Sequence, residues 1–357
     1  MTKEIANDTS PLEGHANFVH LRTRSAYSLL DGMLHPPEIV RWAASQQMPA
    51  IGLADARNLF GVVEFALAAN KAGVQPLIAA AVTIAAETST PIDDRSKTIL
   101  LIAQNATGYA NLNRIVTKLY MPIDGSDAKD YQQMNLSFAE LAEHNEGLIL
   151  LTGGLGAPLG DMVLSGQHES AELWLDHAKE VFGNRLFLEV QRHGLEGEGT
   201  AHETLIAMAD KRQIPLVATN DCRFPRRDQQ RYHDALRAVG RGEKVNQSEA
   251  RLCLNDSYYF RDVLEMENLF ADLPDALENT LHVARMCQFT LEDQSQKPKM
   301  PRITLPDNLD ENDYLWEKTR KGLEYRLKIK GLDAQSEHAT VYSVSYTHLT
   351  LPTIYSV

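Results

Sequence analysis

The sequence predicts an α/β fold, and two features of its pattern support that prediction. Short apolar runs of strand length alternate with amphipathic stretches of helix length between residues 18 and 219. After Asp228 the pattern becomes helical. Strands that alternate with helices form mostly parallel sheets covered by helices. We therefore expect either an open doubly wound sheet or a barrel, because periodicity does not distinguish the two.

Seven runs have the length and composition of buried strands. They are Phe18–Thr23, Ala50–Asp55, Pro76–Ile84, Thr98–Ala103, Leu148–Thr152, Leu186–Gln191 and Leu216–Thr219. Helices are expected over nine stretches, at about 37–47, 60–72, 107–119, 137–144, 169–181, 199–212, 228–240, 275–287 and 312–330. The segment GGLGAPLG (153–160) follows a strand, but its glycine spacing is not that of a dinucleotide-binding loop, so we expect a tight turn there.

The composition is that of a globular protein with a sizeable core. Hydrophobic residues make up 43% of the 357 residues and charged residues 23%. No run approaches the roughly 18 apolar residues of a membrane span, and residues 1–17 lack the pattern of a signal peptide. The sequence therefore predicts a soluble, cytoplasmic protein. Tyr27, Trp42, Phe60 and Phe65 lie among apolar neighbours and are expected in the core.

Cysteine usage and net charge exclude some classes of protein. Cys222, Cys253 and Cys287 lie far apart and form no CxxC pair, which argues against a zinc knuckle and a disulfide framework. We expect buried, unreactive thiols. The net charge is −13, whereas a surface that grips duplex DNA is usually basic. The chain is therefore not expected to hold DNA itself.

Polar side chains gather where the predicted strands end. In parallel α/β folds, functional side chains collect at the carboxyl ends of strands. The residues found at these ends are Arg22, Arg24, Asp55, His193, Asp221 and Arg223. The third predicted strand offers only alanines in its middle, Ala79, Ala80 and Ala81.

The first strand presents two arginines where a metal site would have histidines. Arg22 and Arg24 are two residues apart, so on a strand they point to the same face. A His-x-His pair at this spacing would be a ready metal clamp, whereas a guanidinium stays protonated and offers only donors. Three arginines and two aspartates at one mouth predict a network of ion pairs in place of cations.

Several long motifs resemble the alpha subunits of bacterial DNA polymerase III. They are FVHLRTRSAYSLLDG (18–32), QMPAIGLADARNLFGVVEF (47–65), KAGVQPLIAAAVTI (71–84), PLVATNDCRF (215–224), LFADLPDALENTLHVARMC (269–287) and YLWEKTRKGLEYRL (314–327). The resemblance extends from about residue 18 to residue 330. It implies that residues 18–287 form a PHP (polymerase and histidinol phosphatase) domain, a distorted (β/α)7 barrel, and that 288–342 are a linker and the beginning of a palm domain.

Carried over position by position, the resemblance implies a degenerate metal site. Metal-binding PHP domains hold their ions with His, Asp and Glu side chains. Here the first two histidines are replaced by Arg22 and Arg24, and the later residues of the site by Ala56, Ala81 and Arg223. His193 has the location of a ligand, but we expect a loop histidine bonded to backbone. Asp55 and Asp221 remain as the two candidate metal ligands, and we interpret them as structural partners of the arginines.

The resemblance also implies a function and partners. The family polymerises DNA in chromosomal replication, and its catalytic aspartates, which hold Mg²⁺ in the full-length enzyme, lie further along than this chain extends. We expect no cofactor and no catalytic residue within this chain. Where the PHP site is degenerate, the domain serves as a docking platform for a separate 3′–5′ proofreading exonuclease subunit. The sliding clamp, clamp loader, DNA and dNTPs are expected to bind the C-terminal part of the polymerase.

The two ends of the chain have a composition of their own. Residues 1–17 are polar and aperiodic, which predicts a flexible arm. Residues 343–357 contain no Asp, Glu, Lys or Arg, and the change follows a strongly charged stretch. We interpret this tail as non-native. Asp307, Asp310 and Asp313 are interpreted as residues at the start of a solvated helix and not as catalytic aspartates.

Three other functions remain open at this point. A stand-alone PHP phosphoesterase, such as a histidinol phosphatase, would bind zinc or manganese and hydrolyse a phosphoester. An error-prone translesion polymerase shares the same architecture. The third alternative is that the chain acts only as a binding module for the exonuclease subunit.

Overall fold

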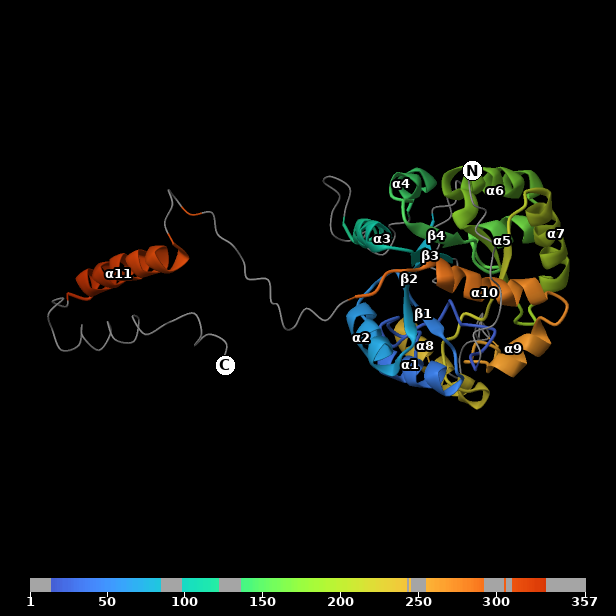
Figure 1. Cartoon of the computed structure of the whole chain (residues 1–357), viewed down its shortest axis with the longest axis horizontal. Coiled ribbons are helices and arrows are strands. Elements are labelled where there is room, and N and C mark those ends of the chain that lie inside the picture. Colours follow the sequence, from blue (N-terminus) through green and yellow to red (C-terminus); the bar gives the residue numbers. More distant parts are fainter. Residues whose placement is uncertain are drawn as a thin grey trace. The chain divides into compact units, whose positions relative to one another are not determined.

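The computed structural model describes residues 14–84, 98–121, 136–242, 255–291 and 310–331, together with Lys244 and Leu305. The chain divides into two compact units, residues 1–293 and 294–357 (Figure 1). The cysteine Cys253, Asp307 and the interpreted tail lie outside the described residues, as do residues 1–13 of the expected arm.

The first unit is built on a curled, mixed sheet. Its six strands are β1 (Ala50–Ala56), β2 (Gln75–Thr83), β3 (Thr98–Ala103), β4 (Leu148–Leu151), β5 (Leu186–Gln191) and β6 (Leu216–Thr219), and their order in the sheet is that of the chain. The pairs β1–β2, β4–β5 and β5–β6 are parallel, whereas β3 runs antiparallel to both neighbours. The α/β prediction is confirmed, and the sheet forms a half-barrel (Figure 1).

Helices surround this sheet. In the first unit they are α1 (Pro36–Ser45), α2 (Val62–Ala72), α3 (Ala106–Lys118), α4 (Phe138–Glu143), α5 (Pro158–Leu164), α6 (His168–Phe182), α7 (Glu198–Lys211), α8 (Gln230–Arg241), α9 (Val263–Leu269) and α10 (Pro274–Met286), with short 3₁₀ turns at Gly183–Arg185 and Arg227–Gln229. Strands β1 to β5 are buried along almost their whole length, which is the pattern of a sheet covered on both faces.

The nine expected helices are present, and two short ones were not expected. Helix α4 begins at a capping box, in which the Ser137 hydroxyl accepts from the Glu140 backbone N–H. Helix α5 was missed because its sequence lies within the segment interpreted as a tight turn, and Pro158 in fact opens the helix. Helix α9 has seven residues and begins at a capping box of Asp262 and Glu265.

The prediction of a regular strand over residues 18–23 is wrong, although the segment does lie where a seventh strand would. Thr23 forms a single parallel bridge with Cys222, after the end of β6. The Arg24 backbone N–H donates to the Cys222 carbonyl at 2.9 Å, and the Gly52 N–H of β1 donates to the His20 carbonyl at 2.7 Å. The segment therefore joins β1 to the chain after β6 through a few bonds.

Two contacts explain why this segment is irregular. The Thr23 hydroxyl donates to the Gly52 carbonyl, an acceptor that a regular ladder would use for a backbone N–H. A Cβ at position 52 would lie 2.2 Å from the Leu21 carbonyl oxygen, so this approach requires glycine. The sequence pattern alone does not reveal either contact.

The second unit contains one described helix, α11 (Glu311–Ile329). Asp310 caps it, since its carboxylate accepts from the Asn312 backbone N–H at 3.2 Å, and Asp313 lies in the first turn. Among the described helices of both units, none is long and apolar enough to cross a membrane. The predicted beginning of a palm domain stays a prediction.

Candidate functional site

A buried network of arginines and carboxylates fills the mouth of the half-barrel. Arg22 and Arg24 come from the irregular segment before α1, and Asp221 and Arg223 follow β6. Two further carboxylates join them, Glu189 in β5 and Asp31 in the loop before α1. Each of these six side chains is almost entirely buried.

Arg22 is held by Glu189 of β5. Its Nε and Nη2 donate to the two carboxylate oxygens of Glu189 at 2.7 and 2.9 Å, and its Nη1 donates to the Thr98 hydroxyl at 3.1 Å. Glu189 also accepts from the Gln191 side-chain amide at 2.8 Å and from the Thr219 hydroxyl. Such a planar, two-bond pair fixes both side chains and satisfies their buried charges.

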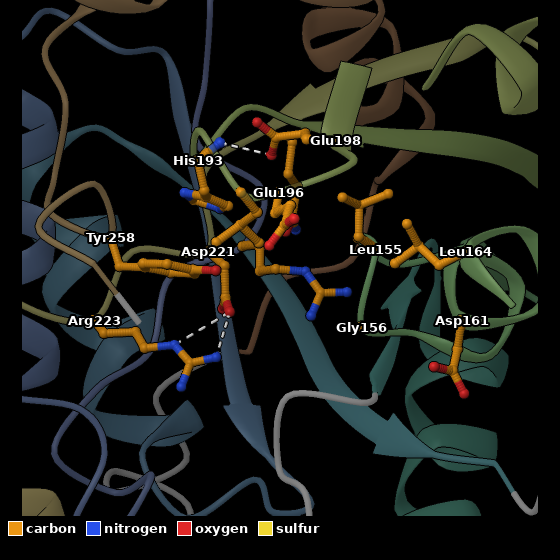
Figure 2. A pocket seen from close by; sticks show the side chains of 14 residues that line it. Leu155, Gly156, Asp161, Leu164, His193, Glu196, Glu198, Asp221, Arg223 and Tyr258 are labelled. Carbon is orange, nitrogen blue, oxygen red and sulfur yellow. Dashed lines mark hydrogen bonds and ion pairs between the residues drawn. The ribbon is translucent and has the colours of Figure 1, made fainter. Parts of the chain in front are cut away.

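Asp221 receives two arginines. Arg24 Nε donates to its Oδ1 at 2.9 Å, and Arg223 Nη2 donates to its Oδ2 at 2.7 Å. Figure 2 shows the bonds from Arg223 to the Asp221 carboxylate, and the Arg223 guanidinium lies over the Tyr258 ring, 5.4 Å from its centroid. Asp221 has a backbone φ of 40°, which is unusual for a residue other than glycine. This strained backbone lies at the point where the two guanidiniums converge on the carboxylate.

Asp31 links the same arginines to helix α8. Its carboxylate accepts from Arg24, Arg223 and Arg237, each with a closest distance of 2.9 Å. The Nε2 of His233 lies 2.8 Å from the Asp31 backbone carbonyl. The loop that precedes α1 is therefore tied to the chain after β6 and to α8 by one carboxylate.

The electrostatics of this cluster favour its charged form. Burial by itself would raise the pKa values of Asp31 and Asp221, but the neighbouring guanidiniums of Arg223 and Arg24 hold both well below the ordinary range. Burial would likewise lower the pKa of Arg223, but the two aspartates raise it. The carboxylates are therefore ionised and paired at neutral pH.

Asp55 is bonded by serines, so the interpretation that it is a direct partner of arginine is wrong, although nearby Arg24 helps to lower its pKa. Its Oδ1 accepts from the Ser25 backbone N–H at 2.8 Å and from the Ser28 hydroxyl at 2.6 Å, and its Oδ2 accepts from the Ser25 hydroxyl at 2.7 Å. Burial raises the pKa of Asp55, and these bonds offset only part of that effect. The nearby serines of the loop supply the donors that we had assigned to guanidiniums.

His193 is a buried, neutral histidine at the edge of the network. Its Nδ1 lies 2.9 Å from the Ser257 hydroxyl, and its ring stacks on Tyr258 with centroids 3.8 Å apart. The expected ring bond to backbone is thus a bond to a side chain. The backbone N–H of His193 donates to Glu198 at 2.8 Å (Figure 2). Burial lowers the pKa of His193 to about 3.

The residues at this mouth do not fit a metal cluster. The three guanidiniums offer donors only, and Ala56 and Ala81, paired near the ends of β1 and β2, have side chains with no ligand atom. Within the described ranges, no group of three or more His, Cys, Asp or Glu side chains could hold a metal ion. Asp221 and Asp55 already accept bonds from arginines and serines.

A cavity of about 230 Å³ opens beside the network. Arg22, Asp221, Arg223, His193 and Tyr258 line one side, as Figure 2 shows for the labelled residues. The cavity therefore lies against the paired arginines.

Sequence reasoning missed Glu189 and Asp31. A signal for Glu189 existed: it is the one charged residue in the buried run LFLEVQ, and a buried charge requires a partner. Asp31 lies within FVHLRTRSAYSLLDG, but nothing in its local pattern shows that it meets residues about 190 positions later. The remaining network residues were identified from the strand ends.

Comparison with known proteins first defines the class. Residues 20–193 match the PHP domain family. A solved structure of an amidohydrolase from Chromobacterium violaceum is similar over 61% of this chain and 96% of that chain, with 15% identity and a TM-score of 0.39. The matched residues contain most of the half-barrel and carry Arg22, Arg24, Asp55, Glu189 and His193. The chain therefore contains a PHP domain.

The similarity to whole proteins is more specific. The DNA polymerase III subunit alpha of Caulobacter vibrioides is 39% identical over 92% of this chain, which covers 28% of that protein. The same subunit of Rickettsia bellii is 35% identical over 91% of this chain, which covers 26% of that protein. The chain belongs to the family of DNA polymerase III alpha subunits, and it spans about a quarter of the length of these relatives.

Proposed function

We propose that this PHP domain does not hydrolyse phosphoesters and serves as the docking platform for the 3′–5′ proofreading exonuclease subunit of a replicative polymerase. The polymerase acts in the cytoplasm with DNA, dNTPs and Mg²⁺, and with the sliding clamp and clamp loader. The family relationship supports the polymerase assignment, and the chemistry of the mouth supports the loss of hydrolysis.

The observation that carries the proposal is the pairing of all three arginines with buried carboxylates. A metal ion at this mouth would need the oxygens of Asp221, and these already accept from Arg24 and Arg223. Displacing the guanidiniums would leave buried charges without partners, which costs several kcal/mol per ion, of the order of 3–5 kcal/mol for one broken pair. The network therefore stabilises a scaffold and excludes the cation.

Metal analysis of the purified chain tests the first half of the proposal. After dialysis against Zn²⁺ or Mn²⁺ and removal of the excess, we expect well below one ion per chain and no hydrolysis of p-nitrophenyl phosphate. A PHP phosphoesterase that retains its histidines is the positive control. Stoichiometric metal together with hydrolysis would contradict the proposal and favour the phosphoesterase.

Direct binding tests the second half. The purified 357-residue chain and the exonuclease subunit of the same organism are mixed in a titration calorimeter. We expect a saturable one-to-one complex. The absence of any complex, with both proteins shown to be folded by circular dichroism, would remove the docking function.

A further inference from the structure

Exposed apolar side chains surround the loop that carries Asp31. They come from three elements: the loop itself, the start of α2 and the end of α8. We call this the α2–α8 surface, and its members are Leu29, Leu30, Phe60, Val63, Leu67 and Val239. Phe60 is 63% exposed and Val239 71% exposed. The expectation that Phe60 belongs to the core is therefore wrong.

Printed contacts show that the three elements are neighbours. The Tyr27 hydroxyl donates to Glu64 of α2 at 3.2 Å, and a Cβ at Gly61 would lie 2.8 Å from the Tyr27 ring. On the other side, a Cβ at Gly240 of α8 would lie 3.1 Å from the Cβ of Leu30. The loop therefore contacts the start of α2 through Tyr27 and the end of α8 through Leu30.

Helix α2 exposes two large apolar side chains beside the polar Glu64, Asn70 and Lys71. Its core face contains Phe65 and Ala69. Val63 and Leu67 are four residues apart, so they lie together on the other face, and both are exposed. A helix whose second face is open to water normally carries polar side chains there. Val63 and Leu67 are therefore suited to contact with another apolar surface.

The loop holds its leucines in a fixed and strained position. Leu30 has a φ of 61°, a conformation that leucine rarely adopts. The Gly32 backbone N–H donates to the Ser28 carbonyl at 2.9 Å, and the ion pairs of Asp31 anchor the next residue. Strain that the surroundings maintain is common at functional sites, and a fixed loop loses little freedom on binding.

The rim of this surface on α8 is basic, although the chain as a whole carries a net charge of −13. Arg231 and Arg241 are exposed in the first and last turns of α8. The Arg231 guanidinium lies over the Tyr232 ring and donates to its hydroxyl at 2.7 Å, so it contacts no carboxylate through these bonds. An acidic partner would complement this rim.

We propose that the α2–α8 surface binds a short protein segment in which acidic side chains flank apolar ones. The inference rests on the proposed docking function, and the segment then belongs to the exonuclease subunit. A protein fits better than a nucleic acid because the centre of the surface consists of aliphatic side chains, which offer nothing to phosphates. The apolar centre supplies the affinity, and the arginines on α8 select the acidic segment.

Surface variants of the 357-residue chain test this inference by calorimetry with the exonuclease subunit. The double variant Phe60→Ala, Val63→Ala should weaken binding at least tenfold. The double variant Arg231→Glu, Arg241→Glu should weaken it by a similar factor, and its effect should shrink at high salt. Leu173→Ala, which changes a 70% exposed leucine on α6, is the matched control and should bind like the unmodified chain.

The outcomes separate the inference from the function on which it rests. If the unmodified chain binds no exonuclease subunit, the docking function itself fails. If it binds and both double variants bind equally well, only the α2–α8 surface is refuted. Weakened binding of a fluorescent single-stranded DNA by the arginine variant, with unchanged exonuclease binding, would also overturn the inference. If the Phe60→Ala, Val63→Ala variant does not fold, binding of the Arg231→Glu, Arg241→Glu variant alone tests the inference.

Discussion

Buried carboxylates at the mouth of the half-barrel have two different kinds of bonding partner. On one side, Asp31 and Asp221 are paired with guanidiniums, and their pKa values are held well below the ordinary range. On the other side, Asp55 accepts from two serines and a backbone N–H, and burial raises its pKa. The difference shows that guanidiniums bind the carboxylates of Asp31 and Asp221, whereas hydroxyl and backbone N–H donors bind that of Asp55.

This comparison also predicts opposite responses to pH. Because the pKa values of Asp31 and Asp221 are lowered in the fold, their contribution to stability is complete above the unfolded pKa of about 3.9 and is lost as the pH falls through the folded values. Asp55 has a raised pKa, so its contribution is complete at low pH and is lost as the pH rises through the folded value. Asp31 and Asp221 therefore make the fold more stable at neutral pH than at low pH, whereas Asp55 makes it less stable at neutral pH than at low pH.

The largest effect is expected on the paired side. Arg223→Met removes a partner of both Asp31 and Asp221 while keeping most of the side-chain volume. Breaking a buried network in this way should lower the free energy of unfolding by about 3–5 kcal/mol. Urea denaturation followed by circular dichroism measures the loss. A change below about 1 kcal/mol would show that the network contributes little.

A smaller effect is expected on the other side. In Asp55→Asn, the amide oxygen can still accept from the Ser25 N–H and the Ser28 hydroxyl, and the amide nitrogen can donate to the Ser25 hydroxyl. We expect a loss of about 1 kcal/mol at pH 7, typical of altered neutral hydrogen bonds. The same denaturation assay applies. A loss as large as that of Arg223→Met would show that the two sides are equivalent.

Two buried histidines also make the stability of the fold depend on pH below neutrality. Burial lowers the pKa of His20 to about 4 and that of His193 to about 3, so both are neutral in the fold. Their contribution is complete above the unfolded pKa and is lost as the pH falls from about 6.5 toward the folded values. Between pH 7 and 5.5, wild type should lose about 1 kcal/mol more than His193→Gln. Equal losses in the two proteins would refute this assignment.

The smallest effect is expected for an arginine outside the mouth. Arg226 pairs with Asp228 at 3.1 Å, and both side chains are about two thirds exposed. Arg226→Ala should change the free energy of unfolding by no more than about 0.5 kcal/mol, because exposed ion pairs contribute little. A loss near that of Arg223→Met would mean that burial does not explain the strength of the network.

The sequence predicted most of the fold because its elements have clear periodicity. Six of the seven expected strands and the nine expected helices are present. Residues 18–23 failed as a regular strand because a side-chain hydroxyl and a close approach at Gly52 replaced ladder bonds, and neither leaves a periodic signal. Helix α5 was hidden by glycines and by Pro158, because proline occurs in turns as well as at helix starts.

The site was predictable in composition but not in pairing. Strand ends indicated which residues meet, since Arg22, Arg24, Asp221 and Arg223 do lie at one mouth. The partners of Asp55 were not predictable, because the serines that bind it lie in a loop whose path depends on tertiary contacts. Asp31 could not be identified for the same reason. Residue type predicts charge, whereas pairing depends on distances that only the folded chain sets.

The most direct test of the account is a crystal structure of the chain grown in millimolar Mn²⁺, with anomalous diffraction recorded near the manganese edge. The account predicts no anomalous peak at the mouth, with Arg22 bound to Glu189 and with Arg24 and Arg223 bound to Asp221. A manganese peak within bonding distance of Asp55 or Asp221, with the guanidiniums turned away, would contradict it.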